Sequence, residues 1–313
     1  MHYVIGDVHG CYDEMMLLLQ KIEKSDPEAQ FIFVGDFIDR GPKVWDVLEW
    51  AMENITEDGK YQSVRGNHEQ LVIEWYLEFV KWCKEKGYET EEPMPNTRYD
   101  FTKWLNNMNY TNPAKILPII EFFHSLPFSK TVTVETKYGK ELTYRIVHGW
   151  YNYEEPQDSE KQKHCNLWER NYWGKQETEE VIVHGHTPTI SLDYRLRGFE
   201  CDVPGMIGYR TNAINVDGGC CYFYQGHYAS AMLCGICLET LEEFYPYTLE
   251  ERFVQNEKVF GKKFNGVSYS EECIEEVAKY MVEEFEADYM GKVSMPRKQI
   301  LRKMRLDDKE EFS

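Results

Sequence analysis

The sequence GDVHG at Gly6–Gly10 follows a short apolar run, Tyr3–Ile5, and precedes apolar residues at helical spacing: Met15, Met16, Leu18, Leu19 and Ile22. An apolar strand, a polar loop and an amphipathic helix are therefore predicted in that order. The loop carries Asp7 and His9, a carboxylate and an imidazole of the kind that bind divalent metals. In isolation such a pair is more often a polar strand end satisfied by the backbone, so its meaning depends on the rest of the chain.

The same order occurs twice more. Phe31–Val34 leads into GDFIDRG at Gly35–Gly41, and Tyr61–Val64 leads into RGNHE at Arg65–Glu69. Apolar residues at helical spacing follow each loop: Val44, Trp45, Val47, Leu48 and Ala51 after the first, and Leu71, Val72, Trp75 and Phe79 after the second. Strands that alternate with helices predict a βαβ arrangement, with the loops gathered at the carboxyl ends of the strands.

Two further fragments, VHG at Val147–Gly149 and VHGHTP at Val183–Pro188, complete a set of candidate metal ligands. The set combines carboxylate, amide and imidazole groups without a thiolate: Asp7, His9, Asp36, Asn67, His148 and His186. Such donors suit Mn²⁺, Fe, Zn²⁺ or Mg²⁺ rather than a soft metal. A carboxylate between two such groups can bridge a pair of ions, and a metal pair can activate water for displacement at phosphorus. The set predicts a hydrolase of phosphate esters.

This ordered series resembles the phosphoprotein-phosphatase family of binuclear metallophosphoesterases, in its bacterial branch. That branch includes protein serine/threonine phosphatases and symmetrical diadenosine tetraphosphatases. The matching fragments run from about Gly6 to Gly219. The resemblance implies an α/β, calcineurin-like metallophosphoesterase fold, with a central β-sandwich of two mixed sheets flanked by helices. It also implies two divalent metal ions, Mn²⁺ before Fe, Zn²⁺ or Mg²⁺.

The resemblance further divides the ligands between the two metals. Asp7 and His9 would bind the first metal, Asp36 would bridge, and Asn67, His148 and His186 would bind the second. His184 would be a neighbour of the site rather than a ligand. Related metallophosphoesterases outside this family carry another histidine two residues after the last ligand, where this chain has Pro188. The first metal is therefore expected to have one protein ligand fewer.

Four residues match catalytic positions of the family. His68 corresponds to the general acid, and Asp39 to the carboxylate that orients it. Arg40 corresponds to a phosphate-binding arginine, a role that the planar guanidinium suits because it matches two phosphate oxygens. Arg170, in the sequence LWER, resembles a second one. The segment NVDGGCCY, which starts at Asn215, resembles the strand that follows the last metal loop.

The sequence pattern also predicts where the chain divides into domains and segments. Residues 1–250 are predicted to form the catalytic domain, and 251–313 a C-terminal helical extension that includes a helix over Glu271–Tyr289. The polar stretch 87–111 is predicted to be an inserted surface or cap segment, and 193–211 a loop. Strands that dispense with intervening helices suggest a second sheet packed on the first: Thr143–Val147, Val181–Val183, Ala213–Val216 and Ser230–Leu238.

Composition restricts the partners. A net charge of −19 argues against stable nucleic-acid binding, which depends on clustered Lys and Arg. The sequence contains no run of eighteen apolar residues and leaves no room for a signal peptide before GDVHG, so a cytoplasmic protein without membrane contact is predicted. The nine cysteines are expected to be free thiols. Cys234 and Cys237 are expected in an apolar strand, with structural zinc or a redox function as the alternative.

These observations lead to one function and two alternatives. The first is a phosphomonoesterase of the serine/threonine protein phosphatase type, which acts on a phosphorylated protein or peptide. The second is a nucleotide pyrophosphohydrolase that acts on diadenosine tetraphosphate. The third is a non-catalytic phosphate-binding module. Aromatic residues near two ligand fragments are expected to be core, with a nucleobase platform as the alternative: Trp150, Tyr151, Tyr153, Trp168, Tyr172 and Trp173. Partner subunits are not predicted.

Overall fold

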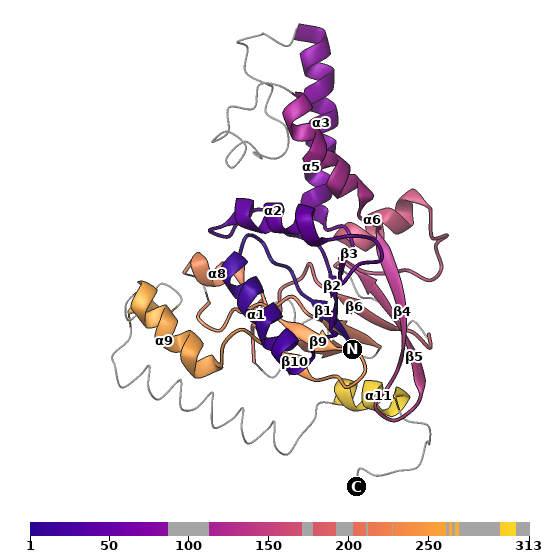
Figure 1. Cartoon of the computed structure of the whole chain (residues 1–313), viewed down its shortest axis with the longest axis vertical. Helices are drawn as coiled ribbons and strands as arrows, with labels where there is room; N and C mark the ends of the chain where they lie inside the picture. Colours follow the sequence, from indigo (N-terminus) through magenta and orange to yellow (C-terminus); the bar gives the residue numbers. More distant parts are fainter. Residues whose placement is uncertain are drawn as a thin grey trace.

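The computed structural model describes residues 1–86, 113–170, 178–191, 203–210, 212–226, 228–260, 263–264, 267–268 and 295–304. The expected insert at 87–111 and the expected helix at Glu271–Tyr289 lie outside these ranges. Within them, two five-stranded mixed sheets form the centre of the molecule and helices flank them (Figure 1). The predicted fold class is confirmed.

The first sheet has the strand order β10–β9–β1–β2–β3. Its strands are β1 (His2–Ile5), β2 (Gln30–Phe33), β3 (Tyr61–Ser63), β9 (Gly235–Cys237) and β10 (Glu243–Phe244). β1, β2 and β3 are parallel, as the repeated strand–loop–helix pattern predicts, whereas β9 runs antiparallel to β1 and β10 antiparallel to β9. The parallel strands direct their following loops to one edge of the sheet.

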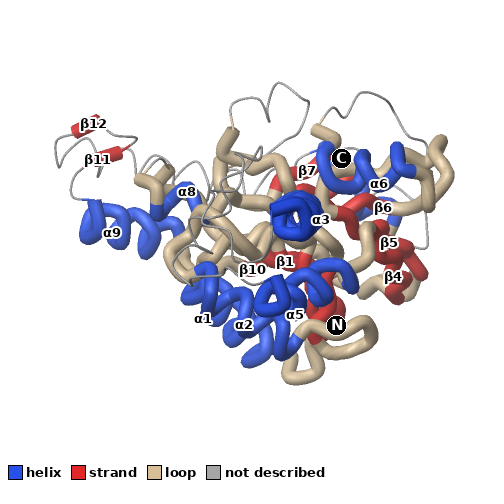
Figure 2. The backbone as a smooth tube through the Cα atoms, turned by 90° about the horizontal axis from the view of Figure 1, so that it is seen from above, coloured by secondary structure: helices blue, strands red, loops and turns tan. Residues whose placement is uncertain are grey.

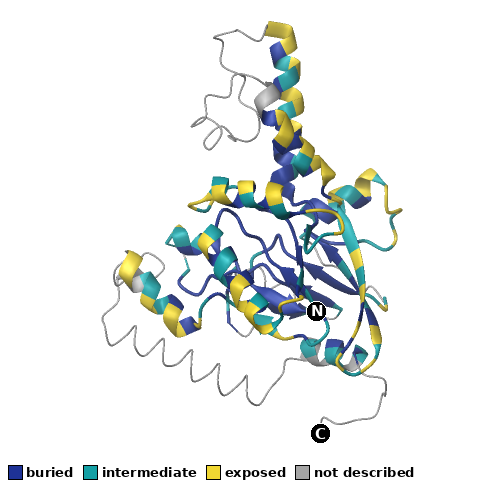
Figure 3. Ribbon diagram, in the orientation of Figure 1, coloured by how far each residue is buried: buried dark blue, intermediate teal, exposed yellow. Residues whose placement is uncertain are grey.

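Four helices belong to this half of the molecule: α1 (Tyr12–Ser25), α2 (Val44–Asn54), α3 (Asn67–Lys86) and α5 (Pro113–Ser125). The apolar positions predicted for α1, α2 and α3 turn towards a common core with Phe31 and Phe33 of β2. Figure 2 shows α1 and α2 on one side of the molecule and β4, β5 and β6 on the other. α3 and α5 project together from the body, and the last residues of α3, Lys84–Lys86, are exposed (Figures 1 and 3).

The second sheet has the order β4–β5–β6–β8–β7. Its strands are β4 (Ser129–Glu135), β5 (Glu141–Val147), β6 (Val181–His184), β7 (Gly208–Arg210) and β8 (Ala213–Asn215). The apolar inner faces of both sheets pack in one core, which joins Val4 and Ile32 to Tyr144 and Val183. β7 corrects the expectation that all of 193–211 is loop. Its polar sequence forms a strand because it pairs with β8 at the edge of the sheet.

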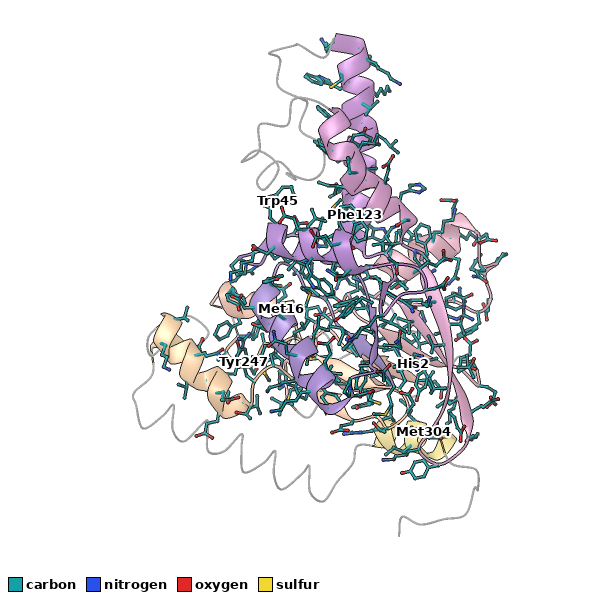
Figure 4. The ribbon with its side chains drawn as sticks, viewed as in Figure 1. His2, Met16, Trp45, Phe123, Tyr247 and Met304 are labelled. Atoms are coloured by element: carbon teal, nitrogen blue, oxygen red, sulfur yellow. The ribbon has the colours of Figure 1, made fainter. Side chains whose placement is uncertain are left out.

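Six shorter or C-terminal elements complete the described structure: the helices α6 (Glu160–Trp168), α8 (Cys221–Tyr224), α9 (Leu249–Phe260) and α11 (Met295–Lys303), and the paired strands β11 (Lys263–Phe264) and β12 (Val267–Ser268). At α11, Ile300 and Met304 are fully buried in the core between the sheets (Figure 4 labels Met304). The domain division at residue 250 stays a prediction. None of the described helices combines the length and the apolar character needed to span a bilayer.

A buried ion pair attaches α9 to the rest of the fold. Arg252 Nη2 lies 2.6 Å from Glu14 Oε1 of α1, and the two side chains are 1% and 0% exposed. Arg252 also donates to the backbone oxygen of Ala231, while the backbone N–H of Leu233 donates to Glu14. The Arg252 and Glu14 side chains thus form hydrogen bonds with backbone groups that a neighbouring strand would otherwise bind. The strand expected over Ser230–Leu238 is therefore wrong in extent, since only β9 is a strand.

Replacing Arg252 with methionine is expected to lower the free energy of unfolding by about 3–5 kcal/mol, because the substitution leaves the Glu14 carboxylate buried without its cation. Urea denaturation of the two proteins measures the difference. The double variant Glu14→Leu/Arg252→Met is the control and should recover part of the loss, since it removes both charges. A loss below about 1 kcal/mol in the single variant would show that the pair does not hold α9 in place.

Candidate active site

Each predicted ligand follows the end of a strand. Asp7 follows β1, Asp36 follows β2 and Asn67 begins α3 just after β3. From the second sheet, His148 follows β5 and His186 follows β6. The carboxyl ends of parallel strands from both sheets thus deliver the residues to one place.

The backbone of these loops is strained. His9, Asp36 and His186 have φ values of 43°, 53° and 66°, and Asp39 and Arg40 have 69° and 67°. Non-glycine residues adopt this left-handed region at a cost of roughly 1–3 kcal/mol each, and such residues concentrate at functional sites. Two glycines are required by space: a Cβ on Gly66 would collide with the Asp36 carboxylate, and one on Gly185 with that of Asp7.

Two groups of side chains converge on Asp36. The ligand atoms of His9, Asp36 and His68 lie within 4.8 Å of one another, as do those of Asp36, His148 and His186. Asp7 belongs to neither group; its carboxylate accepts the backbone N–H of His186 at 3.1 Å. The structure therefore brings the expected bridging carboxylate between two sets of imidazoles.

The hydrogen bonds of His148 show that the second group fits a cation. Its Nδ1 faces the backbone oxygen of Val34 at 2.9 Å, which only accepts, so Nδ1 carries the proton and Nε2 presents a lone pair. That lone pair lies 2.7 Å from Asn67 Oδ1 and 3.4 Å from Asp36 Oδ2. Three acceptor atoms that face one another repel, and a divalent ion, which takes oxygen and imidazole ligands, would relieve that repulsion.

His9 repeats this arrangement on the other side of Asp36. Its Nδ1 donates to the backbone oxygen of Ile38 at 2.7 Å, and its Nε2 lies 3.3 Å from Asp36 Oδ2. Burial, with the charge of Arg40 second, lowers the pKa of His9 well below its usual value. Burial would raise the pKa of Asp36, but His148, His68 and His9 hold it below its ordinary range. Neutral imidazoles around an ionised carboxylate are the protonation states that metal binding requires.

The predicted acid and its orienting carboxylate are also adjacent. His68 Nδ1 lies 2.5 Å from Asp39 Oδ2. Burial would lower the pKa of His68, but Asp36 and Asp39 together raise it above its usual value. The imidazole beside the two carboxylates is thus favoured in its protonated form, which a proton donor needs.

The two predicted arginines lie at the two groups of side chains. Arg40, which is exposed, places Nη1 3.1 Å from His9 Nε2 and Nη2 3.1 Å from His68 Nε2. Arg170 donates to the backbone oxygen of His186 at 2.7 Å, and its Nη2 lies 3.5 Å from His186 Nδ1. Two guanidinium groups therefore bracket the place where the two sets of ligands meet.

Two buried carboxylates were not predicted. Glu69 accepts the backbone N–H groups of Asp36, Phe37 and Gly66, each at 2.9 Å, and so joins two ligand loops. Asp217 accepts the N–H of Gly219, and burial raises its pKa to about 6. Each stood in a quoted motif, RGNHE and NVDGGCCY. A carboxylate that immediately follows a ligand fragment or an apolar strand was the signal that sequence reasoning passed over.

Of the remaining candidates, Trp168 lies beside a ligand, and the others that the structure describes lie in the core or in the other half of the sandwich. Trp150 and Tyr151 are buried in a small core cluster. The Trp168 ring lies edge-on to the His186 ring, with 6.3 Å between the two ring centroids. Tyr172 and Trp173 lie outside the described residues. The thiols of Cys234 and Cys237 have different partners, since the first donates to backbone oxygens of Gly205 and Met232 and the second contacts Glu239. Cys237 lies in β9 and Cys234 directly precedes it.

Comparison with known proteins adds a family and several relatives. Residues 3–221 match the family model described as calcineurin-like phosphoesterase. An asymmetrical bis(5'-nucleosyl)-tetraphosphatase of Halalkalibacterium halodurans is 27% identical over 235 residues, which are 70% of this chain and 85% of that protein. A symmetrical bis(5'-nucleosyl)-tetraphosphatase of Neisseria gonorrhoeae is 38% identical over 72 residues, 23% of this chain and 25% of that one. A solved putative diadenosine tetraphosphatase is 17% identical with a TM-score of 0.46, over 79% of this chain and 94% of that one.

Proposed function

Because the chain belongs to the calcineurin-like phosphoesterase family, whose model covers residues 3–221, we propose that it hydrolyses phosphate esters with two divalent metal ions held around Asp36. One observation carries the proposal: amide and imidazole ligand atoms from both sheets converge on this carboxylate. His9 and Asp7 would hold one metal, and Asn67, His148 and His186 the other.

The chain's own groups have separate roles in this reaction. When bound, the metals would lower the pKa of a water to roughly 7 and withdraw charge from phosphorus. Arg40 and Arg170 would bind the equatorial phosphate oxygens, on which charge spreads in the transition state. His68 would donate its Nε2 proton to the departing oxygen, and Asp39 would hold the imidazole in the required orientation.

The two substrate classes draw support from different observations. The His68–Asp39 pair supports a phosphomonoester of serine or threonine, because an alkoxide leaving group needs a proton. The names of the relatives support a dinucleoside tetraphosphate as the second candidate. Both candidates use the same ligands and the same arginines, so the distinction depends on what surrounds the site.

Removal of the metals is expected to abolish hydrolysis, and Mn²⁺ is expected to restore it best. The test assays the chelated and the Mn²⁺-loaded protein side by side on a phosphoserine peptide and on diadenosine tetraphosphate. The preferred substrate identifies the substrate class. Full turnover by the exhaustively stripped protein would contradict the metal mechanism. A protein that binds both metals but hydrolyses neither substrate would instead support the non-catalytic alternative.

Substitution of Arg40 separates its chemistry from its backbone strain. Arg40→Ala and Arg40→Gly should both reduce turnover by about 10²- to 10³-fold with metal content unchanged, since each removes a donor to the transition state. The glycine variant should be about 0.5–1 kcal/mol more stable than the alanine variant, because φ of 67° strains alanine and not glycine. Steady-state kinetics, metal analysis and urea denaturation measure the three quantities. Loss of metal with full turnover in excess Mn²⁺ would rule out the role of Arg40 in binding phosphate.

A further inference from the structure

The guanidinium of Arg40 contacts the imidazoles of His9 and His68 and also helix α8. It contacts Nε2 of His9 and Nε2 of His68, both at 3.1 Å. Its Cζ lies 5.8 Å from the centroid of the Tyr222 ring, within the range of a cation–π interaction. The thiol of Cys221, next in sequence to Tyr222, also contacts this guanidinium.

The two imidazole contacts are incompatible with the proposed reaction. His9 Nδ1 already donates to Ile38, so Nε2 is the one lone pair that His9 offers to a metal. A metal at that atom takes the acceptor away from Arg40. His68, as a proton donor, carries a hydrogen on Nε2, and two N–H groups do not bind each other at 3.1 Å. Arg40 must therefore leave both imidazoles when the site is loaded, and α8 remains as its support.

Helix α8 is itself fixed relative to the first ligand loop. The thiol of Cys220, at its start, lies 3.3 Å from the backbone oxygen of Asp7 and 3.4 Å from that of Val8. Farther along α8, the Phe223 ring lies 3.5 Å from Cζ of Arg252, which is held by the buried pair with Glu14. The helix that carries Tyr222 is thus held at both ends by buried contacts. These contacts fix the position of the Tyr222 ring beside Arg40.

We propose that Tyr222 is the positioning residue that keeps the Arg40 guanidinium aimed at the phosphate after the two imidazoles have released it. The inference rests on the proposed function. An aromatic ring suits this task better than a carboxylate, because it contacts the face of the guanidinium and leaves the N–H groups for phosphate oxygens. Tyr222 is half-buried and Arg40 is exposed, so a substrate phosphate can reach the arginine while the ring stays 5.8 Å from its Cζ.

Binding of inorganic phosphate to the Mn²⁺-loaded protein, measured by calorimetry, tests the proposal without relying on turnover. Tyr222→Leu should weaken phosphate binding by about 3- to 10-fold, the effect of losing one cation–π contact. Tyr222→Phe keeps the ring and should restore most of the affinity. The matched control is Tyr138→Leu, which removes a half-buried ring that makes a cation–π contact with Lys137 in the turn between β4 and β5. It should leave phosphate affinity unchanged.

A double-mutant cycle separates positioning of Arg40 from a general effect on the fold. In an Arg40→Ala background, Tyr222→Leu should cause no further loss of phosphate affinity, since the side chain that it positions is gone. An equal loss in both backgrounds, or full affinity in Tyr222→Leu alone, would overturn the inference and leave the proposed function intact. Failure of the wild-type Mn²⁺-loaded protein to bind phosphate would overturn the proposed function and this inference with it.

Discussion

Replacement of Asp36 by asparagine is expected to abolish hydrolysis and to deplete both metals together. The loss should exceed the roughly 10²- to 10³-fold that removal of a single transition-state donor causes, because one carboxylate serves both metals. Asp36 Oδ2 lies 3.3 Å from His9 Nε2 and 3.4 Å from His148 Nε2, in the middle of the two groups. Asparagine keeps the shape but brings neither the charge nor two acceptor oxygens. Elemental analysis alongside turnover measures both effects.

Asp13→Asn is the matched control for this substitution. This substitution makes the same chemical change on the surface of α1, where the Asp13 side chain is 59% exposed and paired with Lys43. It should leave turnover and metal content unchanged. Asp36→Asn protein that binds one metal normally and loses the other would show that Asp36 is a terminal ligand and not a bridge.

The parts of the fold that sequence predicts are those that local chemistry determines. The helical spacing of Met15, Leu18, Leu19 and Ile22 predicts the buried face of α1, because one side of a helix meets the core whatever that core contains. Parallel strands β1, β2 and β3 follow from the repeated strand–loop–helix order, and with them the gathering of the loops. The candidate site was therefore predictable from residues that each lie within a few positions of an apolar strand.

The parts that sequence does not predict depend on distant partners. β4 is an edge strand with a largely polar, half-exposed sequence, so its pairing with β5 has no strong hydrophobic alternation to reveal it. The pairing of Glu14 with Arg252 spans 238 residues, and nothing in either local pattern marks it. The same pair binds the backbone of Ala231 and Leu233, so the first part of the strand expected over Ser230–Leu238 does not form. In the site, the contact of Asp7 with the His186 backbone likewise comes from the meeting of the two sheets.

Replacement of His68 by asparagine is expected to distinguish a proton donor from a residue that only binds metal or phosphate. Hydrolysis of a phosphoserine peptide should fall by about 10²- to 10⁴-fold, the range for a positioned general acid, because serine leaves as a basic alkoxide. Hydrolysis of nitrophenyl phosphate should fall far less, since nitrophenolate leaves without a proton. The decisive measurement is the ratio of the two losses at constant metal content. Asparagine keeps a polar side chain at the start of α3 while removing the titratable nitrogen.

Two companion variants make that ratio interpretable. Asp39→Asn should show the same selectivity in weaker form, because Asp39 acts on the substrate only through the imidazole whose Nδ1 it holds at 2.5 Å. His124→Asn, an exposed histidine on α5 whose backbone oxygen accepts from Arg65, should change neither rate. Equal losses on both substrates in His68→Asn, with metal content unchanged, would mean that His68 positions the nucleophile or the phosphate. In that event, the selectivity expected of Asp39→Asn would be absent as well, because Asp39 would then orient a residue that does not donate the proton.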